Sequence, residues 1–457
     1  RDQRRILSYS SEDGSARLWS VRPAASFVLQ FPQADQVAHL ALAAAPAAEE
    51  GASQPGGPYT TLLASGAHDG RIEVWRLERS AAGLVPALRW RLGGEGQGHQ
   101  DRVRRVSFSP SAELLASAGF DGTARVWDLA KGEEVCTLAL PPDAQPCTQN
   151  GNPDCPVIYH ALFTPQGDWL LTASNDSWYP VRLWDLRACV PLGEDLPMDP
   201  GAGSVRAAAL ARGEEGEVWV ASGAENGTVR VLRVDAAGQW TPVCAGPWHK
   251  NTVQDLAFSP DARHLATASE EGRIALVEIA GGSCSKPRYL EPEAGPATSV
   301  RFAPDGRTLV TASGEGEAQV WDLNGTLLAR LSGHKARILS LDVSRDGRWL
   351  LTASRDGTVR LWPSPTLAQA QPLTAYLTLS AGLGGASHAS FSPDGLSIGA
   401  AYRNDVALLW QVWNEGPVAD PDLAATWGAD RARLSLIQAA QRFMDENLQP
   451  VRPLPAP

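Results

Sequence analysis

The sequence predicts an all-β fold in which small four-stranded antiparallel sheets are arranged radially around an axis. Two observations predict it. A single phrase, made of a short apolar strand, a tight turn and a strand that ends on a large aromatic residue, returns along the chain. The 457 residues also include 43 Gly and 34 Pro, which implies many turns and suits short strands better than long helices.

The repeated phrase is clearest at residues 350–362, LLTASRDGTVRLW, and at residues 114–127, LLASAGFDGTARVW. Self-similarity at a regular spacing is the signature of a repeat architecture. In each copy an apolar run predicts one strand, Asp-Gly or a related pair predicts a tight turn, and a second run predicts the next strand. The copies close at Trp19, Trp75, Trp127, Trp184, Leu232, Val277, Trp321, Trp362 and Trp410.

Another strand precedes each of these pairs and ends in a Pro-Asp-Gly-like turn, as in SVRFAPDG at 299–306 and HASFSPDG at 388–395. Four antiparallel strands in about 45 residues form one small sheet. One such sheet cannot bury both of its faces, so the sheets are expected to stack face to face in a ring.

Over residues 1–413 the chain resembles the WD-repeat family of β-propellers. Gly98-His99 and Gly333-His334 match the Gly-His that precedes the innermost strand in that family. The family's Trp-Asp ending is matched by Trp127-Asp128, Trp184-Asp185 and Trp321-Asp322. The resemblance implies a WD-repeat β-propeller built of four-stranded blades.

The same resemblance implies a hydrogen-bonded structural tetrad of His, a strand Ser or Thr, a turn Asp and the closing Trp. Two repeats carry the whole set, which is His99, Ser117, Asp121 and Trp127 in one and His334, Thr352, Asp356 and Trp362 in the other. Repeats five and six depart from it, with Leu232 and Val277 in place of Trp and with Asn226 and Glu271 in place of Asp. Looser blades are expected there.

The number of blades stays open. Propellers of this family close when an outermost strand from early in the chain completes the last blade. If residues 86–92 (PALRWRL) are that strand, residues 84–413 form seven blades, and residues 1–83 are incomplete repeats at the end of a preceding propeller. We favour that division. Eight blades closed by SFVLQF at 26–31, or a nine-repeat ring, are the alternatives.

Residues 414–457 change character. Leu434, Ile437, Ala440 and Met444 recur at helical spacing, and the prolines from Pro450 onward prevent further helix. We expect a C-terminal helical tail with a Pro-rich end, docked on the flank of the propeller in preference to serving as a partner-binding helix.

Charge and composition exclude several classes. A net charge of −11 argues against a nucleic-acid platform, which needs clustered Lys and Arg. No apolar run reaches the about 18 residues of a membrane helix, and the start does not resemble a signal peptide, so a cytoplasmic location without membrane contact is expected. The chain opens at Arg1 inside a strand-like pattern, which suggests a piece of a longer protein.

The six Cys are not spaced as a disulfide scaffold. Cys147 and Cys155 lie close together and could pair, but free thiols are expected. His99 and His334 are explained as tetrad members, and His160, His249 and His388 fall near equivalent positions of their repeats. Metal-ligand spacings are absent from the sequence, so no metal site is expected.

Catalytic and cofactor chemistry is not expected either. The turn carboxylates recur once per blade, which spaces them around a ring, whereas acid–base carboxylates must converge. The sequence contains neither a phosphate-binding Gly-x-x-x-x-Gly-Lys-Ser/Thr nor a nucleophile elbow. We therefore predict a non-catalytic module without a cofactor.

The turn before each Trp strand opens on one face and is free to specify a partner. Aromatic and Arg side chains dominate binding hot spots, and exposed Trp suggests a contact. The candidates for partner binding on this face are Trp178, Tyr179, Trp248, Phe120, His68, Arg355, Arg403, Glu225 and Glu270.

Together these features predict a protein or peptide recognition module. Propeller arrays of this composition also resemble the sensor ends of bacterial signal-transducing ATPases, in which effector and ATPase domains lie elsewhere in the parent chain. A passive scaffold that holds a multiprotein complex together is the alternative.

Overall fold

The computed structural model describes most of the ring and leaves several loops and both ends of the chain aside. The described residues are 5–9, 16–20, 27–30, 37–45, 61–80, 83–93, 98–139, 156–176, 180–192, 204–291, 295–365, 372–373, 375–380, 384–395, 397–403, 406–411 and 418–419.

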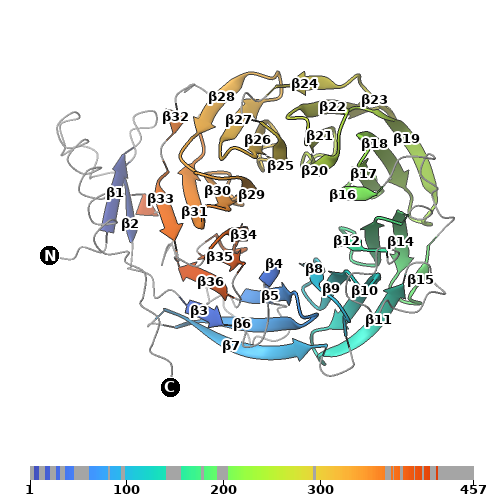
Figure 1. The fold of residues 1–457 in the computed structure, drawn as a ribbon, viewed down its shortest axis with the longest axis horizontal. Coiled ribbons are helices and arrows are strands. Elements are labelled where there is room, and N and C mark those ends of the chain that lie inside the picture. Colours follow the sequence, from blue (N-terminus) through green and yellow to red (C-terminus); the bar gives the residue numbers. More distant parts are fainter. Residues whose placement is uncertain are drawn as a thin grey trace.

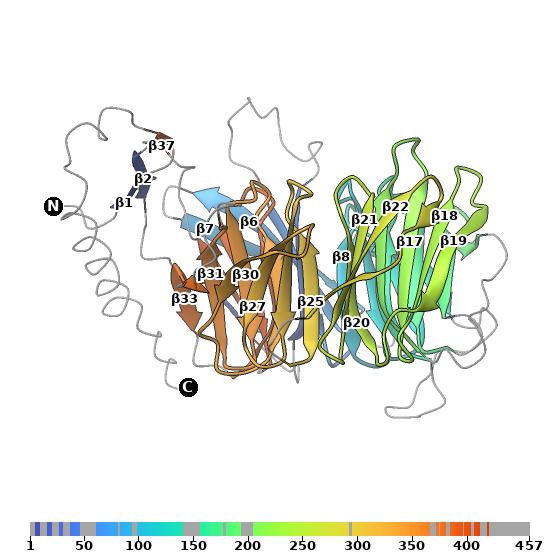
Figure 2. The ribbon, with the colours of Figure 1, turned by 90° about the horizontal axis from the view of Figure 1, so that it is seen from above.

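Eight small sheets stand around an open centre (Figure 1), and from the side their strands run across the thickness of the ring (Figure 2). Each sheet is one blade. The strands of the blades pair antiparallel, apart from the short β32, and run along the chain from the innermost strand outward, apart from the outer strand of the last blade. The ring of four-stranded sheets predicted from the repeats is thereby confirmed.

Blades 1 to 4 each contain four consecutive strands. Blade 1 holds β4 (Val37–Ala44), β5 (Thr61–Ala67), β6 (Ile72–Ser80) and β7 (Gly83–Leu92). Blade 2 holds β8 (Val103–Phe108), β9 (Leu114–Gly119), β10 (Thr123–Asp128) and β11 (Glu133–Ala139). Blade 3 holds β12 (Ile158–Phe163), β13 (Trp169–Ser174), β14 (Val181–Asp185) and β15 (Val190–Pro191). Blade 4 holds β16 (Val205–Arg212), β17 (Val218–Ala224), β18 (Thr228–Val234) and β19 (Trp240–Pro247).

Blades 5 to 7 add short strands at their outer edges. Blade 5 holds β20 (Val253–Phe258), β21 (His264–Ser269), β22 (Ile274–Ala280), β23 (Ser283–Cys284) and β24 (Arg288–Leu290). Blade 6 holds β25 (Ala297–Phe302), β26 (Thr308–Ser313), β27 (Ala318–Asp322), β28 (Leu327–Leu331) and the parallel β32 (Pro372–Leu373). Blade 7 holds β29 (Ile338–Val343), β30 (Trp349–Ser354), β31 (Thr358–Pro363) and β33 (Leu377–Ser380).

Blade 8 joins the two ends of the ring. Its inner strands are β34 (Ala386–Phe391), β35 (Ser397–Tyr402) and β36 (Val406–Gln411). Its outer strand is β3 (Phe27–Gln30), which pairs antiparallel with β36. Three further strands, β1 (Arg5–Tyr9), β2 (Ala16–Ser20) and β37 (Val418–Ala419), form a separate three-stranded sheet.

The closure corrects the favoured seven-blade division. Residues 86–92 belong to β7, which stays hydrogen-bonded to β6 in its own blade and so cannot complete the last one. Residues 37–80 lie in the first blade of the same ring, so a boundary at 83/84 would cut through that blade. Closure by the segment at 26–31, the eight-blade alternative, matches the observed β3. The predicted helical tail lies outside the described residues apart from β37.

The core lies between blades. One apolar cluster joins Val310 and Val320 of blade 6 to Leu350 and Trp362 of blade 7, and each of these side chains is fully buried. Burying a side chain of this size contributes roughly 1.5–3 kcal/mol, so each blade is stabilised mainly by its neighbours.

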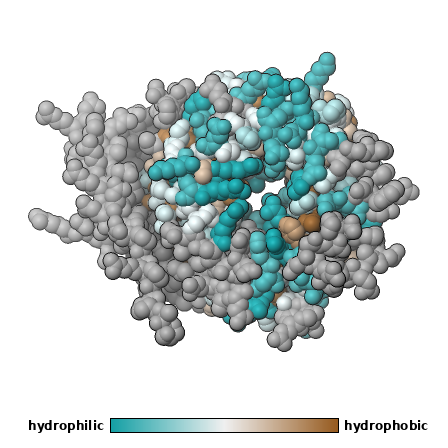
Figure 3. Space-filling model, in the orientation of Figure 1, coloured by the Kyte–Doolittle hydropathy of each residue, from teal (hydrophilic) through white to brown (hydrophobic). Residues whose placement is uncertain are grey.

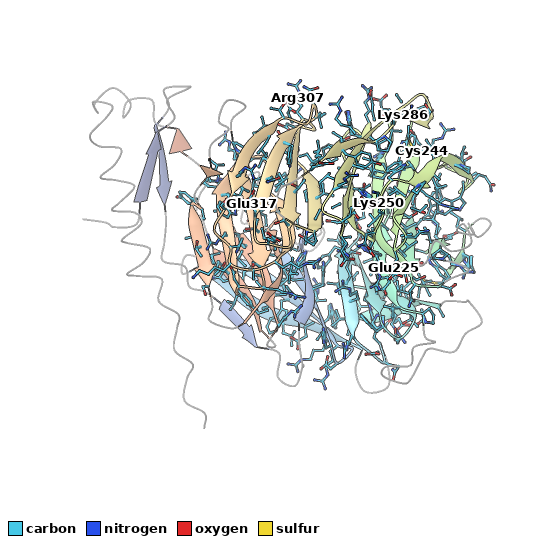
Figure 4. The ribbon with its side chains drawn as sticks, turned by 45° about the horizontal axis from the view of Figure 1, so that its top comes forward. Glu225, Cys244, Lys250, Lys286, Arg307 and Glu317 are labelled. Carbon is cyan, nitrogen blue, oxygen red and sulfur yellow. A yellow bond between two sulfur atoms is a disulfide. The ribbon has the colours of Figure 1, made fainter. Side chains whose placement is uncertain are left out.

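Two disulfides cross between neighbouring blades. Cys136 on β11 of blade 2 pairs with Cys189 of blade 3, with the Cα atoms 5.7 Å apart. Cys244 on β19 of blade 4 (Figure 4) pairs with Cys284 on β23 of blade 5, with the Cα atoms 5.9 Å apart. The sequence spacing predicted no disulfide scaffold, and the pairing of these four residues corrects that prediction. Cys147 and Cys155 lie outside the described residues.

Candidate partner-binding face and its supports

The turns between the second and third strands are held in place by the tetrads. In blade 2, His99 Nδ1 lies 3.0 Å from Asp121 Oδ1, and His99 Nε2 lies 2.7 Å from Ser117 Oγ. Trp127 Nε1 donates to the same Ser117 Oγ at 3.0 Å. The side chains of His99 and Asp121 are fully buried. The chain of contacts ties the turn to both flanking strands.

Blade 7 repeats this arrangement. His334 Nδ1 lies 2.9 Å from Asp356 Oδ2, His334 Nε2 lies 2.7 Å from Thr352 Oγ1, and Trp362 Nε1 donates to Thr352 Oγ1 at 2.9 Å. Since the indole can only donate, Thr352 accepts from Trp362 and donates to His334. His334 Nδ1–H then donates to the carboxylate, which assigns the tautomer from the network.

The pKa shifts agree with a neutral imidazole beside an ionised carboxylate. Burial alone would raise the pKa of Asp356, but hydrogen bonds from the Thr358 hydroxyl and from the amides of Lys335 and Thr358 outweigh it and lower that pKa to about 2. Burial lowers the pKa of His334, and the neighbouring Asp356 only partly offsets that effect.

Blades 3, 5 and 6 keep parts of the tetrad. In blade 5, His249 contacts Thr267 Oγ1 at 2.8 Å and Glu271 Oε1 at 2.9 Å, so the Glu takes the place of the turn Asp. Val277 gives this blade no indole donor. Blades 3 and 6 form the Trp–Thr contact, by Trp184 to Thr172 at 2.8 Å and by Trp321 to Thr311 at 3.1 Å.

His160 and His388 do not occupy the tetrad position, which corrects the sequence interpretation. His99, His249 and His334 come before their innermost strands, whereas His160 and His388 lie inside β12 and β34. The sequence does carry the distinguishing signal. His99 precedes the first residue of its strand, Val103, while His160 follows the first residue of its strand, Ile158.

The face formed by these turns, here called the turn face, carries one equivalent residue per blade. In the turns of seven blades the backbone amide of that residue donates to a carbonyl in the segment before the innermost strand of the same blade, as in Phe120 to Arg102 at 2.9 Å, Arg355 to Arg337 at 3.0 Å and Gly314 to Pro296 at 2.7 Å. The same bond is made by Asn175, Glu225, Glu270 and Arg403. Most of the partner-binding candidates thus share one face of the ring.

Their exposure differs. Glu270, Arg355 and Arg403 are exposed, while His68, Phe120 and Glu225 are half-buried. Phe120 lies under the Arg102 guanidinium, 6.0 Å from the ring centroid, and Glu225 forms an ion pair with Arg206 at 2.5 Å. Burial would raise the pKa of Glu225, and the hydrogen bond from Arg206 outweighs it and lowers that pKa. Glu225 is therefore already paired within the protein.

Trp248 is not a surface contact, which corrects its assignment. Its side chain is 9% exposed and belongs to the apolar cluster between blades 4 and 5. Its carbonyl accepts a hydrogen bond from Tyr289 Oη at 2.8 Å. Trp178 and Tyr179 lie outside the described residues.

Arg355 and Arg403 form the feature of this face that is most available to a partner. They occupy equivalent turn positions on the adjacent blades 7 and 8, and both are exposed. No ion pair joins either of them to another of the described residues. Sequence reasoning named both residues among several others, and their freedom from partners emerges only from the structure.

The part of the chain that the structure describes contains no helix long and apolar enough to cross a membrane, and no group of three or more His, Cys, Asp or Glu side chains placed to hold a metal ion.

The comparisons with known proteins point to one family. The model of the WD domain, G-beta repeat, matches residues 91–128, 240–277, 288–322 and 325–363. The small ribosomal subunit protein RACK1y of Oryza sativa subsp. japonica is 30% identical over 185 residues, which are 40% of this chain and 46% of that protein. Apoptotic protease-activating factor 1 of Danio rerio is 26% identical over 290 residues, which are 63% of this chain and 20% of that protein. The chain thus spans less than half the length of these curated relatives.

Solved structures agree on the fold. The C-terminal WD40 domain of Sif2 superimposes with a TM-score of 0.63 at 15% identity, over 84% of this chain and 98% of that one. The computationally designed Ika8 protein gives a TM-score of 0.61 at 20% identity, over the same shares of the two chains. WD40 propellers are generally non-catalytic and typically serve as protein-interaction modules. Four segments of the chain are thus similar to the WD domain, G-beta repeat, and the closed ring of eight blades is a β-propeller.

Proposed function

We propose that this propeller recognises a partner protein through the turn face, and that the partner offers an acidic segment to blades 7 and 8. The observation that carries the proposal is the pair of exposed cations, Arg355 and Arg403, at equivalent positions on adjacent blades. A guanidinium without an internal carboxylate gains most from a partner's carboxylate, since its planar fork can donate two parallel hydrogen bonds.

The neighbouring candidates support the same assignment. Phe120 is partly exposed beside Arg102, and aromatic and Arg side chains are the residue types that dominate binding hot spots. Glu270 is exposed on blade 5 of the same face, so a long partner that spans the ring needs a basic residue at that end.

At the level of the whole protein we propose that the propeller is the ligand-sensing end of a larger signalling or defence protein, of the kind that bacterial signal-transducing ATPases exemplify. The similarity to a zebrafish protein named as an apoptotic protease-activating factor supports this, because the matched region is 20% of that protein. Binding would act by stabilising one conformation of the parent protein. The alternative is a passive scaffold within a multiprotein complex.

The two disulfides are informative about the cellular compartment in which the protein folds. Disulfides form and persist in oxidising environments and are rare in the cytosol, so Cys136–Cys189 and Cys244–Cys284 favour an oxidising compartment over the expected cytoplasm.

The test of partner binding is capture of partners by the wild-type chain, by the double variant Arg355→Glu and Arg403→Glu, and by a control, Arg307→Glu. Arg307 (Figure 4) is exposed in the turn after β25, at the other ends of the strands from the turn face. We expect the double variant to lose a captured partner by at least about tenfold in affinity, or ~1.4 kcal/mol, while the control keeps it.

Equal capture by all three proteins would contradict the turn-face assignment and move the interface to the flank of the ring. Loss in the control as well would show that net charge, and no particular face, governs the interaction. A partner that only the double variant fails to capture would support the turn face. If binding of that partner leaves hydrogen exchange in the rest of the protein unchanged, the scaffold is favoured over the sensor.

A further inference from the structure

The innermost strands carry a second one-per-blade ring of side chains, independent of the turn face. Each innermost strand has a β-bulge near its start, and the residue after the bulge pairs with a Gly or Ala on the next strand. A bulge re-aims the side chain that follows it. In order from blade 1 to blade 8 these residues are His39, Arg105, His160, Ala207, Asp255, Ser299, Ser340 and His388.

This ring surrounds the central opening, which remains visible when side chains are drawn in full (Figure 3). Its chemistry is unevenly distributed. Blades 8, 1, 2 and 3 contribute three imidazoles and a guanidinium, whereas blades 4 to 7 contribute a methyl group, a carboxylate and two hydroxyls. One half of the ring is thus rich in nitrogen and the other in oxygen.

The oxygen-rich half is satisfied internally. Asp255 Oδ2 accepts hydrogen bonds from Ser299 Oγ at 2.7 Å and from Arg301 Nη1 at 2.7 Å. Ser340 Oγ donates to the carbonyl of Ala389 at 3.3 Å. The carboxylate already has its cation, and the hydroxyl already has its acceptor.

The polar groups of the nitrogen-rich half are not all satisfied within the protein. The rings of His39 and His388 lie 4.1 Å apart between centroids, and Nδ1 of each is buried without a hydrogen-bond partner among the described residues. Arg105 Nη1 donates to His160 Nδ1 at 3.0 Å, and no described carboxylate forms an ion pair with Arg105. His160 Nε2 donates to the carbonyl of Arg206 at 3.0 Å, which leaves its Nδ1 as the acceptor.

A half-buried guanidinium without a carboxylate partner, together with the two buried Nδ1 atoms that lack hydrogen bonds, is costly unless something compensates these groups. Burial lowers the pKa of Arg105 to about 10 and that of His388 to about 3, and it holds the pKa of His39 and of His160 well below the usual range. Desolvation is the largest cause of each of these shifts, neighbouring cationic and imidazole groups add to it, and the carboxylate of Asp255 partly offsets it at Arg105.

We propose that His388, His39 and Arg105 form an anion-binding site on one side of the central channel, which takes a compact oxyanion with phosphate or carboxylate oxygens. The guanidinium supplies charge and a two-pronged donor, and the imidazoles supply N–H groups. A metal cation does not fit, because Arg105 in the same cluster would repel it.

The site predicts a pH dependence of binding. An anion favours the protonated imidazole, so binding takes up a proton and the affinity should rise as the pH falls from neutral toward mildly acidic values. Other charged or titratable groups of the surrounding innermost strands are Arg104 on β8, Tyr159 and His160 on β12, Arg206 and Arg212 on β16, Asp255 on β20, Arg301 on β25 and Asp342 on β29. Asp342 lies in the satisfied half, where its Oδ2 accepts from the amide of Phe391 at 2.8 Å.

The experiment is calorimetric titration of the whole chain with inorganic phosphate and, separately, with citrate, together with NMR of the histidine ring nitrogens. The variants are Arg105→Gln, His39→Gln and the control Arg307→Gln, which removes an exposed positive charge far from the channel. We expect binding to wild type and control, a loss of at least about tenfold in both channel variants, and shifts of the His39 and His388 resonances.

Failure of both anions to bind the folded wild-type chain would overturn the proposal, and so would equal binding by Arg105→Gln and the wild type. Arg105→Lys is the second variant, to be used if Arg105→Gln does not fold. It keeps the positive charge but removes the planar guanidinium that can donate two parallel hydrogen bonds. An intermediate affinity is expected for it, and wild-type affinity would count against the site. Binding of phosphate alone would assign a phosphate ligand, and binding of citrate as well would admit a carboxylate. Since neither Arg355 nor Arg403 takes part, the result does not depend on the proposed function.

Discussion

Blades 2 and 7 differ from blades 4 and 5 in how they are stabilised. Blades 2 and 7 each tie their turn to their strands through a complete tetrad, ending in Trp127 or in Trp362. Blades 4 and 5 have Leu232 and Val277 at that position, and a disulfide, Cys244–Cys284, joins them to each other. Since Cys136–Cys189 also links blade 2 to blade 3, the comparison teaches that a disulfide to the next blade can accompany a complete tetrad, as in blade 2, or accompany the loss of its Trp, as in blades 4 and 5.

The largest effect is expected from breaking a complete tetrad. Trp362→Ala removes a fully buried indole and leaves Thr352 Oγ1 without its donor, so we expect a loss of ~3–5 kcal/mol in the free energy of unfolding. Val277→Ala at the equivalent position of blade 5 should cost roughly 2 kcal/mol, since fewer buried carbons are removed. Denaturant midpoints measured by circular dichroism would decide this, and equal losses would mean that neither the greater size of the indole nor its hydrogen bond to Thr352 adds to stability.

Breaking the covalent link should come next. Cys244→Ser with Cys284→Ser should destabilise the protein by ~2–4 kcal/mol, with the increase in hydrogen exchange confined to blades 4 and 5. Cys136→Ser with Cys189→Ser is the matched control, because it should loosen blades 2 and 3 less, where the tetrad of blade 2 remains. Alkylation of all four thiols in unreduced, denatured protein would contradict the disulfides themselves.

The smallest effect is expected on the stability of blade 7 at low pH. The folded pKa of Asp356 is about 2, below the ~3.9 of an unfolded Asp, so its stabilising contribution is present above about pH 4 and is lost as the pH falls through 2. We expect blade 7 to exchange its amides faster over that interval, and Asp356→Asn to remove the dependence. The same acid response in the variant would assign it to other carboxylates.

Much of the fold is readable in the sequence because the repeated phrase places a strand, a turn and a Trp at a regular spacing. The strand that closes the ring cannot be identified from the sequence, because two segments, PALRWRL and SFVLQF, both have the pattern of a strand. Only their pairing partners in the structure, β6 and β36 respectively, distinguish them. The disulfides could not be predicted from the sequence for a related reason. Cys136 and Cys189 are 53 residues apart and come together only where blades 2 and 3 are in contact.

The candidate site is predictable in part. Arg355 and Arg403 follow from the turn position alone, whereas the freedom of each guanidinium depends on neighbours from other segments. Trp248 reads as a surface aromatic beside His249, yet the stacking of blades 4 and 5 buries it. His160 and His388 show that a residue's place relative to its strand matters more than its place in the repeat count.

The pairing of the outer strand of blade 8 determines how late in synthesis the ring can close. Phe27 pairs with Leu409, about 380 residues later, so a ribosome that adds roughly 5–20 residues each second needs tens of seconds to deliver the partner strand. Throughout that interval Leu40 and Leu63 of blade 1, which in the finished ring pack against Leu409, have no neighbour on that side. A nascent chain of this kind needs protection at its first blade until its last one emerges.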